Sequence, residues 1–106
     1  MRLILLVKFG VQSMPDKPNR EWRAQKRAMI DDLAESEQID GEVYDVWWTM
    51  GPHDLVIHAR VGNQVAAHAF SLTLSRKLKA EVVCMSALRD NDVDPVFDVL
   101  FIRNGP

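Results

Sequence analysis

Residues 43–61 of this chain, VYDVWWTMGPHDLVIHARV, decide its fold. Two runs rich in valine, isoleucine and aromatic residues, 43–49 and 55–61, flank a Met-Gly-Pro-His sequence at residues 50–53. β-Branched and aromatic residues favour strands, and a glycine beside a proline favours a tight turn. The stretch therefore predicts a β-hairpin.

The position of the turn sets the register of this hairpin. With the turn centred on Gly51 and Pro52, the pairs on one side are apolar apart from one tyrosine hydroxyl: Trp48 with Leu55, Val46 with Ile57, and Tyr44 with Ala59. The residues on the other side are Asp45, Trp47, Thr49, Val56, His58 and Arg60. We expect the apolar side to face the core and the mixed side to form the wall of a ligand-binding cleft. We also expect Gly51 to adopt a positive φ in the turn.

Strand and helix signals alternate on both sides of the hairpin. Further strands are expected at residues 3–9, 81–88 and 96–102, and helices at residues 20–37 and 64–78. Asn19 and Asn63 stand where the two helices need an N-cap. The order is βαββαβ plus a C-terminal strand, which predicts an α+β, ferredoxin-like fold with an antiparallel sheet and both helices on one face.

We divide the chain into a ferredoxin-like domain over residues 1–90 and a C-terminal extension over residues 91–106. In the second helix, the apolar residues available to the core are Val65, Ala69, Phe70, Leu72 and Leu74. The extension contains an apolar run, residues 96–102, with a single charge. Left exposed, such a run is prone to aggregate, so we expect it to pair with a sheet edge of its own subunit or of a partner.

The first strand is apolar on both of its sides. One alternating set is Leu3, Leu5, Val7 and Phe9, and the other contains Ile4 and Leu6. Strands that are apolar on both sides are covered on both sides, but two helices cover only one face of a sheet. We therefore expect a second copy of the chain to cover the other face, sheet against sheet, in a homodimer or a higher homo-oligomer.

Composition narrows the class of protein. The chain has 106 residues, 47% of them hydrophobic and 26% charged, with a formal net charge of -2. These values describe one globular domain, and they argue against a protein that coats nucleic acid or an anionic membrane. The single cysteine, Cys84, excludes an intrachain disulfide and favours a reducing compartment. The apolar run at residues 3–7 is too short for a signal peptide or a membrane helix, so we expect a cytoplasmic protein.

The stretch Val46-Trp47-Trp48-Thr49-Met50-Gly51-Pro52-His53-Asp54-Leu55-Val56-Ile57 resembles the central hairpin of the GYD-domain family. An alanine-rich helix after it and the sequence Ala-Leu-Arg at residues 87–89 are also similar to that family, and the resemblance covers about residues 1 to 90. It implies a dimeric α/β barrel of ferredoxin-like subunits without an assigned activity. Gly51 and Asp54 match the family signature, whereas His53 replaces its tyrosine.

Several side chains of the hairpin are candidates for chemistry. His58 beside Asp45 is the best acid–base candidate, because a carboxylate fixes the tautomer of an imidazole, although a structural cross-strand pair is the simpler interpretation. Arg60 suits a substrate carboxylate or an ion pair at the strand end. Asp54 suits backbone N–H groups at the turn or the role of a base in the cleft, and His53 at the loop tip is expected to be solvated. No spacing of histidines predicts a metal site.

Charges are segregated along the first helix. Basic residues gather at its start, and acidic residues follow directly. This order opposes the helix dipole, so we expect the helix to pair with an oppositely running helix or an acidic segment of a neighbouring subunit.

Two functions remain open. The first is a homo-oligomeric protein that binds a small apolar or aromatic ligand with Trp47, Thr49, His53, Asp54, Val56, His58 and Arg60. The second is a small enzyme without a tightly bound cofactor, an oxygenase or an isomerase, that uses His58, Asp45 and Arg60. No cofactor motif and no specific catalytic signature decides between them, because fold alone does not determine function.

Overall fold

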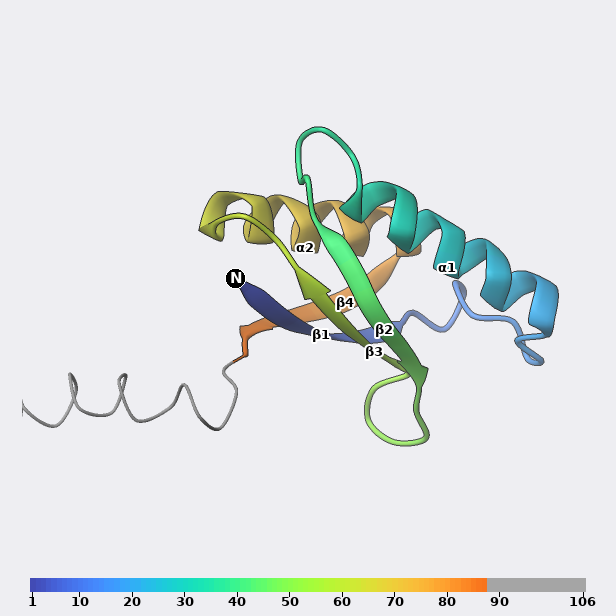
Figure 1. Cartoon of the computed structure of the whole chain (residues 1–106). Helices are drawn as coiled ribbons and strands as arrows, with labels where there is room; N and C mark the ends of the chain where they lie inside the picture. The colour runs from blue at the N-terminus through green and yellow to red at the C-terminus, as the bar shows by residue number, and fades with distance from the viewer. Residues whose placement is uncertain (88–106) are drawn as a thin grey trace, which may run out of the picture.

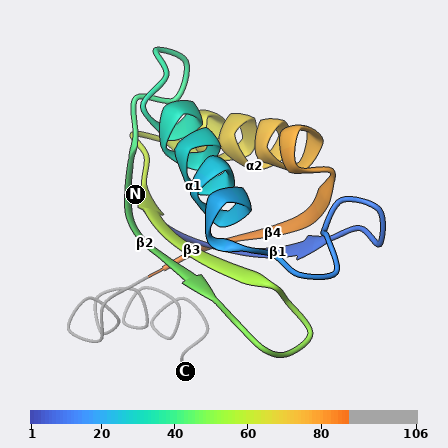
Figure 2. The same cartoon turned by 90° about the vertical axis from the view of Figure 1, so that its right-hand side faces the viewer.

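The computed structural model describes residues 1–87 and has an α+β fold (Figure 1). Its elements are β1 (Arg2–Phe9), α1 (Arg20–Ala34), β2 (Glu42–Trp48), β3 (Leu55–Arg60), α2 (Gln64–Leu78) and β4 (Ala80–Ser86). The strands form one antiparallel sheet in the order β2-β3-β1-β4. Both helices lie on the same face of this sheet (Figure 2). The ferredoxin-like prediction is confirmed for residues 1–87, and the strand predicted at 96–102 lies outside the described residues.

Local side-chain contacts begin both helices as the sequence predicts. The Asn19 side chain accepts a hydrogen bond from the Trp22 N–H at 2.9 Å, and the Asn63 side chain accepts one from the Ala66 N–H at 2.8 Å. α1 ends at Ala34, three residues before the predicted end at residue 37. The chain turns there because it buries the side chain of Ile39 against the core.

The connection from α1 to β2 requires a glycine. At Gly41 the backbone passes so close to β3 that an added Cβ would lie 2.5 Å from the Arg60 carbonyl oxygen. The Gly41 N–H donates to the Ala34 carbonyl at 2.7 Å and ties the connection to the end of α1. A larger residue has to push the two segments apart, so this glycine fixes how β2 joins the sheet.

The core lies between the sheet and the two helices. The strands contribute alternate residues that are fully buried: Leu3, Leu5, Val7, Leu55, Ile57 and Ala59. The largest buried side chain is Phe70 of α2. At one end of the layer the rings of Phe9, Trp22 and Trp48 pack together, with centroids 5.4 to 6.1 Å apart.

Two of the core positions predicted for α2 are wrong. Val65 is 79% exposed and Leu72 is 60% exposed. The buried residues of α2 are Ala66, Ala67, Phe70, Leu74 and Leu78. These follow the helical repeat along one side. Val65 and Leu72 are seven positions apart, about two helical turns, so both lie on the opposite side of the helix.

The hairpin register is confirmed except at one position. Trp47 lies opposite Val56 and Asp45 lies opposite His58, as predicted. At the end of the hairpin, however, Ala59 pairs with Val43 instead of Tyr44, because a β-bulge inserts one extra residue in β2. The bulge releases Tyr44 from the helix-covered side and leaves it 38% exposed.

The turn of the hairpin differs from its prediction in one respect. Gly51 does not have a positive φ, and an added Cβ would meet no atom within 4 Å. Among residues 1–87 the left-handed conformation belongs to Asp40 and Lys79, and Lys79 caps the C-terminus of α2. The six-residue connection from Trp48 to Leu55 is long enough to turn without a left-handed glycine.

Candidate functional site

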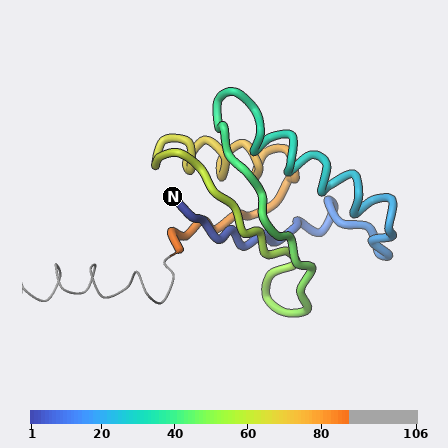
Figure 3. The backbone as a smooth tube through the Cα atoms, in the orientation of Figure 1, coloured from blue at the N-terminus to red at the C-terminus, as the bar shows by residue number. Residues whose placement is uncertain are grey.

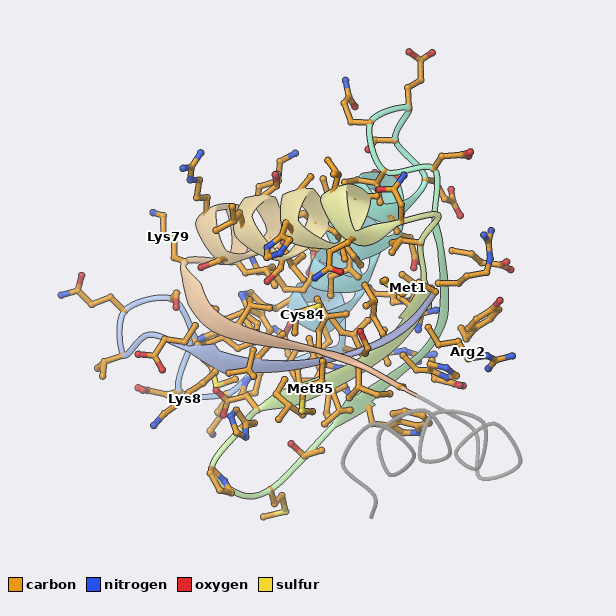
Figure 4. The ribbon with its side chains drawn as sticks, turned by 90° about the vertical axis from the view of Figure 1, so that its left-hand side faces the viewer. Met1, Arg2, Lys8, Lys79, Cys84 and Met85 are labelled. Carbon is orange, nitrogen blue, oxygen red and sulfur yellow. The ribbon has the colours of Figure 1, made fainter. Side chains whose placement is uncertain are left out.

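The face of the sheet that the helices leave uncovered, which we call the open face, carries the predicted site. Successive residues of a strand point to opposite sides, and Figure 4 shows this for Cys84 and Met85 of β4. Cys84 lies on the side of the helices and Met85 on the open face. The tube in Figure 3 shows this sheet below the two helices, and the sheet consists of β2, β3, β1 and β4 in that order.

An apolar band crosses the open face. One row of paired residues runs through all four strands: Trp47, Val56, Leu6 and Val83. In the next row, Ile4 pairs with both His58 and Met85. Trp47, Val83 and Met85 are 49%, 48% and 44% exposed, so the band faces water in the single chain.

A polar cluster borders this band at the β2 side. His58 Nδ1 lies 3.5 Å from Asp45 Oδ2, and the His58 side chain is 21% exposed. The Tyr44 ring lies 5.2 Å from the imidazole, and the Arg2 guanidinium lies 5.6 Å from the centre of the Tyr44 ring. The Asp45 carboxylate can accept a hydrogen bond from an N–H at Nδ1, which leaves Nε2 of the imidazole available to another group.

Two arginines end the open face beside this cluster. Arg60 of β3 lies opposite Arg2 of β1 and opposite Glu42 of β2. This end of the open face thus carries two arginines and one carboxylate, and the Arg2 guanidinium lies over the Tyr44 ring. Such an end suits an anionic group, because guanidinium groups bind carboxylates with paired hydrogen bonds.

Three of the predicted site residues take part in the turn instead. The Phe9 N–H donates to Asp54 Oδ2 at 2.9 Å, and the Asp54 N–H donates to the Val7 carbonyl at 2.8 Å. The Thr49 hydroxyl donates to the His53 carbonyl. Asp54 thus joins the hairpin to β1, which supports the structural interpretation of this carboxylate.

Sequence reasoning missed two members of the cluster, Tyr44 and Arg2. The hairpin pattern predicts Tyr44 against the helices, and only the bulge brings it to the open face. Arg2 comes from β1, and its nearness to the hairpin depends on the pairing of β1 with β3. The alternation of β1 is a usable signal, because it places Arg2 on the same side as Ile4 and Leu6.

On the helix-covered side of the sheet, the residues that line a cavity include Cys84. A cavity of about 280 Å³ between α2 and the β1–β4 edge is lined by Met1, Leu3, Gln64, Ala67, His68, Ser71, Cys84 and Ser86. Partial burial raises the pKa of the Cys84 thiol. Because the thiolate is the reactive form, this thiol is a poor nucleophile.

Neither a metal centre nor a membrane span is evident in the described part of the chain. Within residues 1–87, no three histidine, cysteine, aspartate or glutamate side chains are grouped so as to hold a metal ion. Neither helix of that part combines the length and the apolar character needed to cross a bilayer.

Comparison of the chain with protein-family models, with curated proteins and with solved structures gives no match. The function of this chain is therefore inferred from the geometry of its open face.

Proposed function

We propose that this chain is a homodimeric binding protein that encloses a small aromatic or apolar carboxylate between the open faces of two sheets. The observation that carries the proposal is the exposed apolar band, in which Trp47, Val83 and Met85 are each more than two-fifths exposed. A water-exposed band that spans four strands is unusual for a monomer and typical of an interface.

A second copy is the cover that fits this face best. Sheets pack face to face at about 10 Å, and a twofold axis places the same surface on both sides of the contact. The side chains of the band carry no charge, so two such bands can face each other without repulsion between like charges. Packing two bands together removes from water the side chains that the helices do not reach.

The proposed ligand site needs both copies. A single open face is a surface without walls, so it encloses a ligand only when a second sheet lies above it. The rings of Trp47 and Tyr44 offer an aromatic or apolar ligand its contact area, while Arg60 and Arg2 offer a carboxylate its charge partners. His58 lies between these groups and fixes the orientation of the ligand.

The dimer is tested by a charge placed in the band. In Val83→Glu an unpaired carboxylate has to be buried, so the dimer dissociation constant rises by at least about tenfold. Sedimentation equilibrium measures this constant. The matched control is Leu72→Glu, which places the same charge on an equally apolar, exposed residue of α2 outside the band. Equal effects of the two substitutions, or a monomeric parent chain, would refute the dimer.

The ligand is tested with 2-naphthoate as a probe. Binding beside Trp47 changes the tryptophan fluorescence of the protein, and Arg60→Gln weakens binding because the carboxylate loses its partner. Arg76→Gln removes a charge of the same kind from α2 and is the control. Unchanged affinity in Arg60→Gln, or no fluorescence change in the parent protein, argues against this site. Native mass spectrometry of the freshly purified protein identifies the bound molecule.

The Asp45–His58 pair favours a second candidate, a small enzyme of the oxygenase or isomerase class without a tightly bound cofactor. A carboxylate 3.5 Å from Nδ1 orients the imidazole, whose Nε2 then acts as a base on a ligand above Trp47. In an enzyme, His58→Ala abolishes turnover of the bound molecule without lowering the melting temperature. In a binding protein, the parent chain and the His58→Ala variant both release the molecule chemically unchanged.

Membership of the GYD-domain family is part of this proposal. It is supported by Gly51 and Asp54 at the turn and by the Trp-Thr sequence that precedes them. The dimeric α/β barrel that the resemblance implies is the assembly proposed here. The single cysteine supports the cytoplasm as the location, because no intrachain disulfide is available.

A further inference from the structure

A groove runs along the outer edge of the sheet, between α1 and β2. Its residues are Arg20, Arg23, Ala24 and Arg27 of α1 and Val46 and Trp48 of β2, and its volume is about 240 Å³. β2 is the terminal strand of the sheet formed by residues 1–87, so its outward N–H and C=O groups pair with no neighbouring strand there. A free strand edge of this kind accepts a further extended segment.

The wall of the groove is positively charged. Arg20, Arg23 and Arg27 follow one side of α1 and span about 10 Å along the helix axis. Arg27 is paired with Asp31 at 3.1 Å, whereas Arg20 and Arg23 form no ion pair within residues 1–87. The floor is apolar, because Val46 and Trp48 are half-buried against the core. The groove therefore suits an extended segment that carries carboxylates on one side.

The chain contains such a segment in its own sequence. Residues 90–94 are Asp-Asn-Asp-Val-Asp, with a carboxylate at every second position. In an extended segment these three carboxylates point to one side and span about 13 Å, close to the span of the arginines. Pro95 follows directly and lacks the N–H that a longer ladder would need.

The segment of the same copy cannot place Asp90 at the edge of β2, so it cannot bring all three aspartates into this groove. Ala87 lies beside Arg2 on β1, at the edge of the sheet opposite β2. Three strand spacings across the sheet and three residues along it separate Ala87 from Val46, a distance of about 17 Å. The three residues from Ala87 to Asp90 extend over at most about 11 Å.

We propose that residues 90–94 of a second copy lie along the edge of β2 in this groove, with their aspartates against the arginines of α1. The contact rests on the self-association proposed above but uses a different surface. It also gives the basic start of α1 the acidic partner that its charge order predicts.

Cross-linking of full-length chains tests the contact. Both chains carry Cys84→Ser; one adds Ala24→Cys in the groove, and the other adds Asn91→Cys and is labelled with ¹⁵N. After mixing, a short bismaleimide is expected to join labelled and unlabelled chains, and mass spectrometry identifies the product. A chain that carries both cysteines and cross-links only within itself would show that its own segment fills the groove, which overturns the proposal.

Charge reversal tests the role of the arginines. In the chain that carries Ala24→Cys, Arg20→Glu/Arg23→Glu is expected to lower the yield of cross-link at least about tenfold at low salt. Asp92→Arg/Asp94→Arg in the chain that carries Asn91→Cys is expected to restore the yield. Arg76→Glu on α2 is the control and leaves the yield unchanged. A dimer in sedimentation without a cross-link overturns this contact alone. A monomer without a cross-link overturns the proposed dimer as well.

Discussion

The two faces of the sheet carry apolar side chains from the same strands, yet only one face is shielded from water. Leu5 and Ile57 on the helix-covered face are 0% exposed, whereas Trp47 and Val83 on the open face are 49% and 48% exposed. The difference follows from the number of layers, because α1 and α2 both lie on one side (Figure 2). One face is thus a core of the single chain, and the other is the face that the proposed second copy would cover.

Polar groups divide between the faces in the same way. Among residues 1–87 the buried set contains no polar or charged residue, while His58, Asp45 and Tyr44 gather on the open face. A buried ionisable group is costly unless it is paired, whereas the open face keeps such groups within reach of solvent or a ligand. The covered face therefore supplies stability, and the open face is where we expect binding.

The largest change in the free energy of unfolding is expected when neighbouring residues of β3, which point to opposite faces, are truncated in turn. Ile57→Ala leaves a cavity in the core and lowers the free energy of unfolding by about 2 to 5 kcal/mol. Val56→Ala on the open face costs less than half of that in the dissociated chain, because water already reaches the site. Urea denaturation at a protein concentration below the dimer dissociation constant measures both. Equal losses would contradict the difference between the faces.

A smaller effect is expected at the glycine where the chain enters the sheet. Gly41→Ala puts a methyl group against the Arg60 carbonyl and is expected to cost about 1 to 3 kcal/mol of unfolding free energy. Gly51→Ala at the hairpin turn meets open space and changes the stability by less than about 1 kcal/mol. Thermal unfolding of the two variants separates them. If Gly41→Ala unfolds at the same temperature as the parent chain, the close approach of Gly41 to the Arg60 carbonyl does not require a glycine.

A further effect concerns the role of Asp54. Asp54→Ala leaves the Phe9 N–H without its acceptor and is expected to cost about 1.5 kcal/mol. His53→Ala next to it is the control, because only the backbone carbonyl of His53 is hydrogen-bonded in the turn. Denaturant unfolding and the affinity for 2-naphthoate are both measured. An Asp54→Ala chain of normal stability with lost affinity would return Asp54 to the ligand site.

The smallest effect is expected on the helix-covered side, at Cys84. Because burial raises the pKa of this thiol, the folded chain disfavours the thiolate, and iodoacetamide reacts more slowly with it than with the urea-unfolded chain. The protonated thiol therefore contributes stability that is complete below its ordinary pKa and is lost as the pH rises through the raised pKa. Cys84→Ala removes this alkaline loss. Equal alkylation rates in the folded and unfolded chains contradict the assignment.

Features that depend on neighbouring residues were predictable from the sequence. The bounds of α2 at Gln64–Leu78 and the caps at Asn19 and Asn63 are confirmed. Helix propensity, capping and the twofold alternation of strands act over a few residues, so a linear pattern contains them. The register of the hairpin is confirmed for the same reason up to Asp45, where the bulge begins.

Features that depend on distant contacts were not predictable. Tyr44 reaches the open face because of a bulge that no short pattern specifies. Val65 and Leu72 are apolar but exposed, because the direction in which α2 turns its core side is set by packing on β4 and β1. Arg2 joins Tyr44 and His58 only through the pairing of β1 with β3.

The sequence by itself determined the order of the elements and the apolar character of both sides of β1, because propensity, capping and side-chain alternation are local. The tertiary structure decided which apolar side the two helices cover. It also decided which polar residues meet on the other side and which residues of β2 line a groove with the arginines of α1. These outcomes depend on residues that are distant in the chain, and only the packing of complete layers brings such residues together.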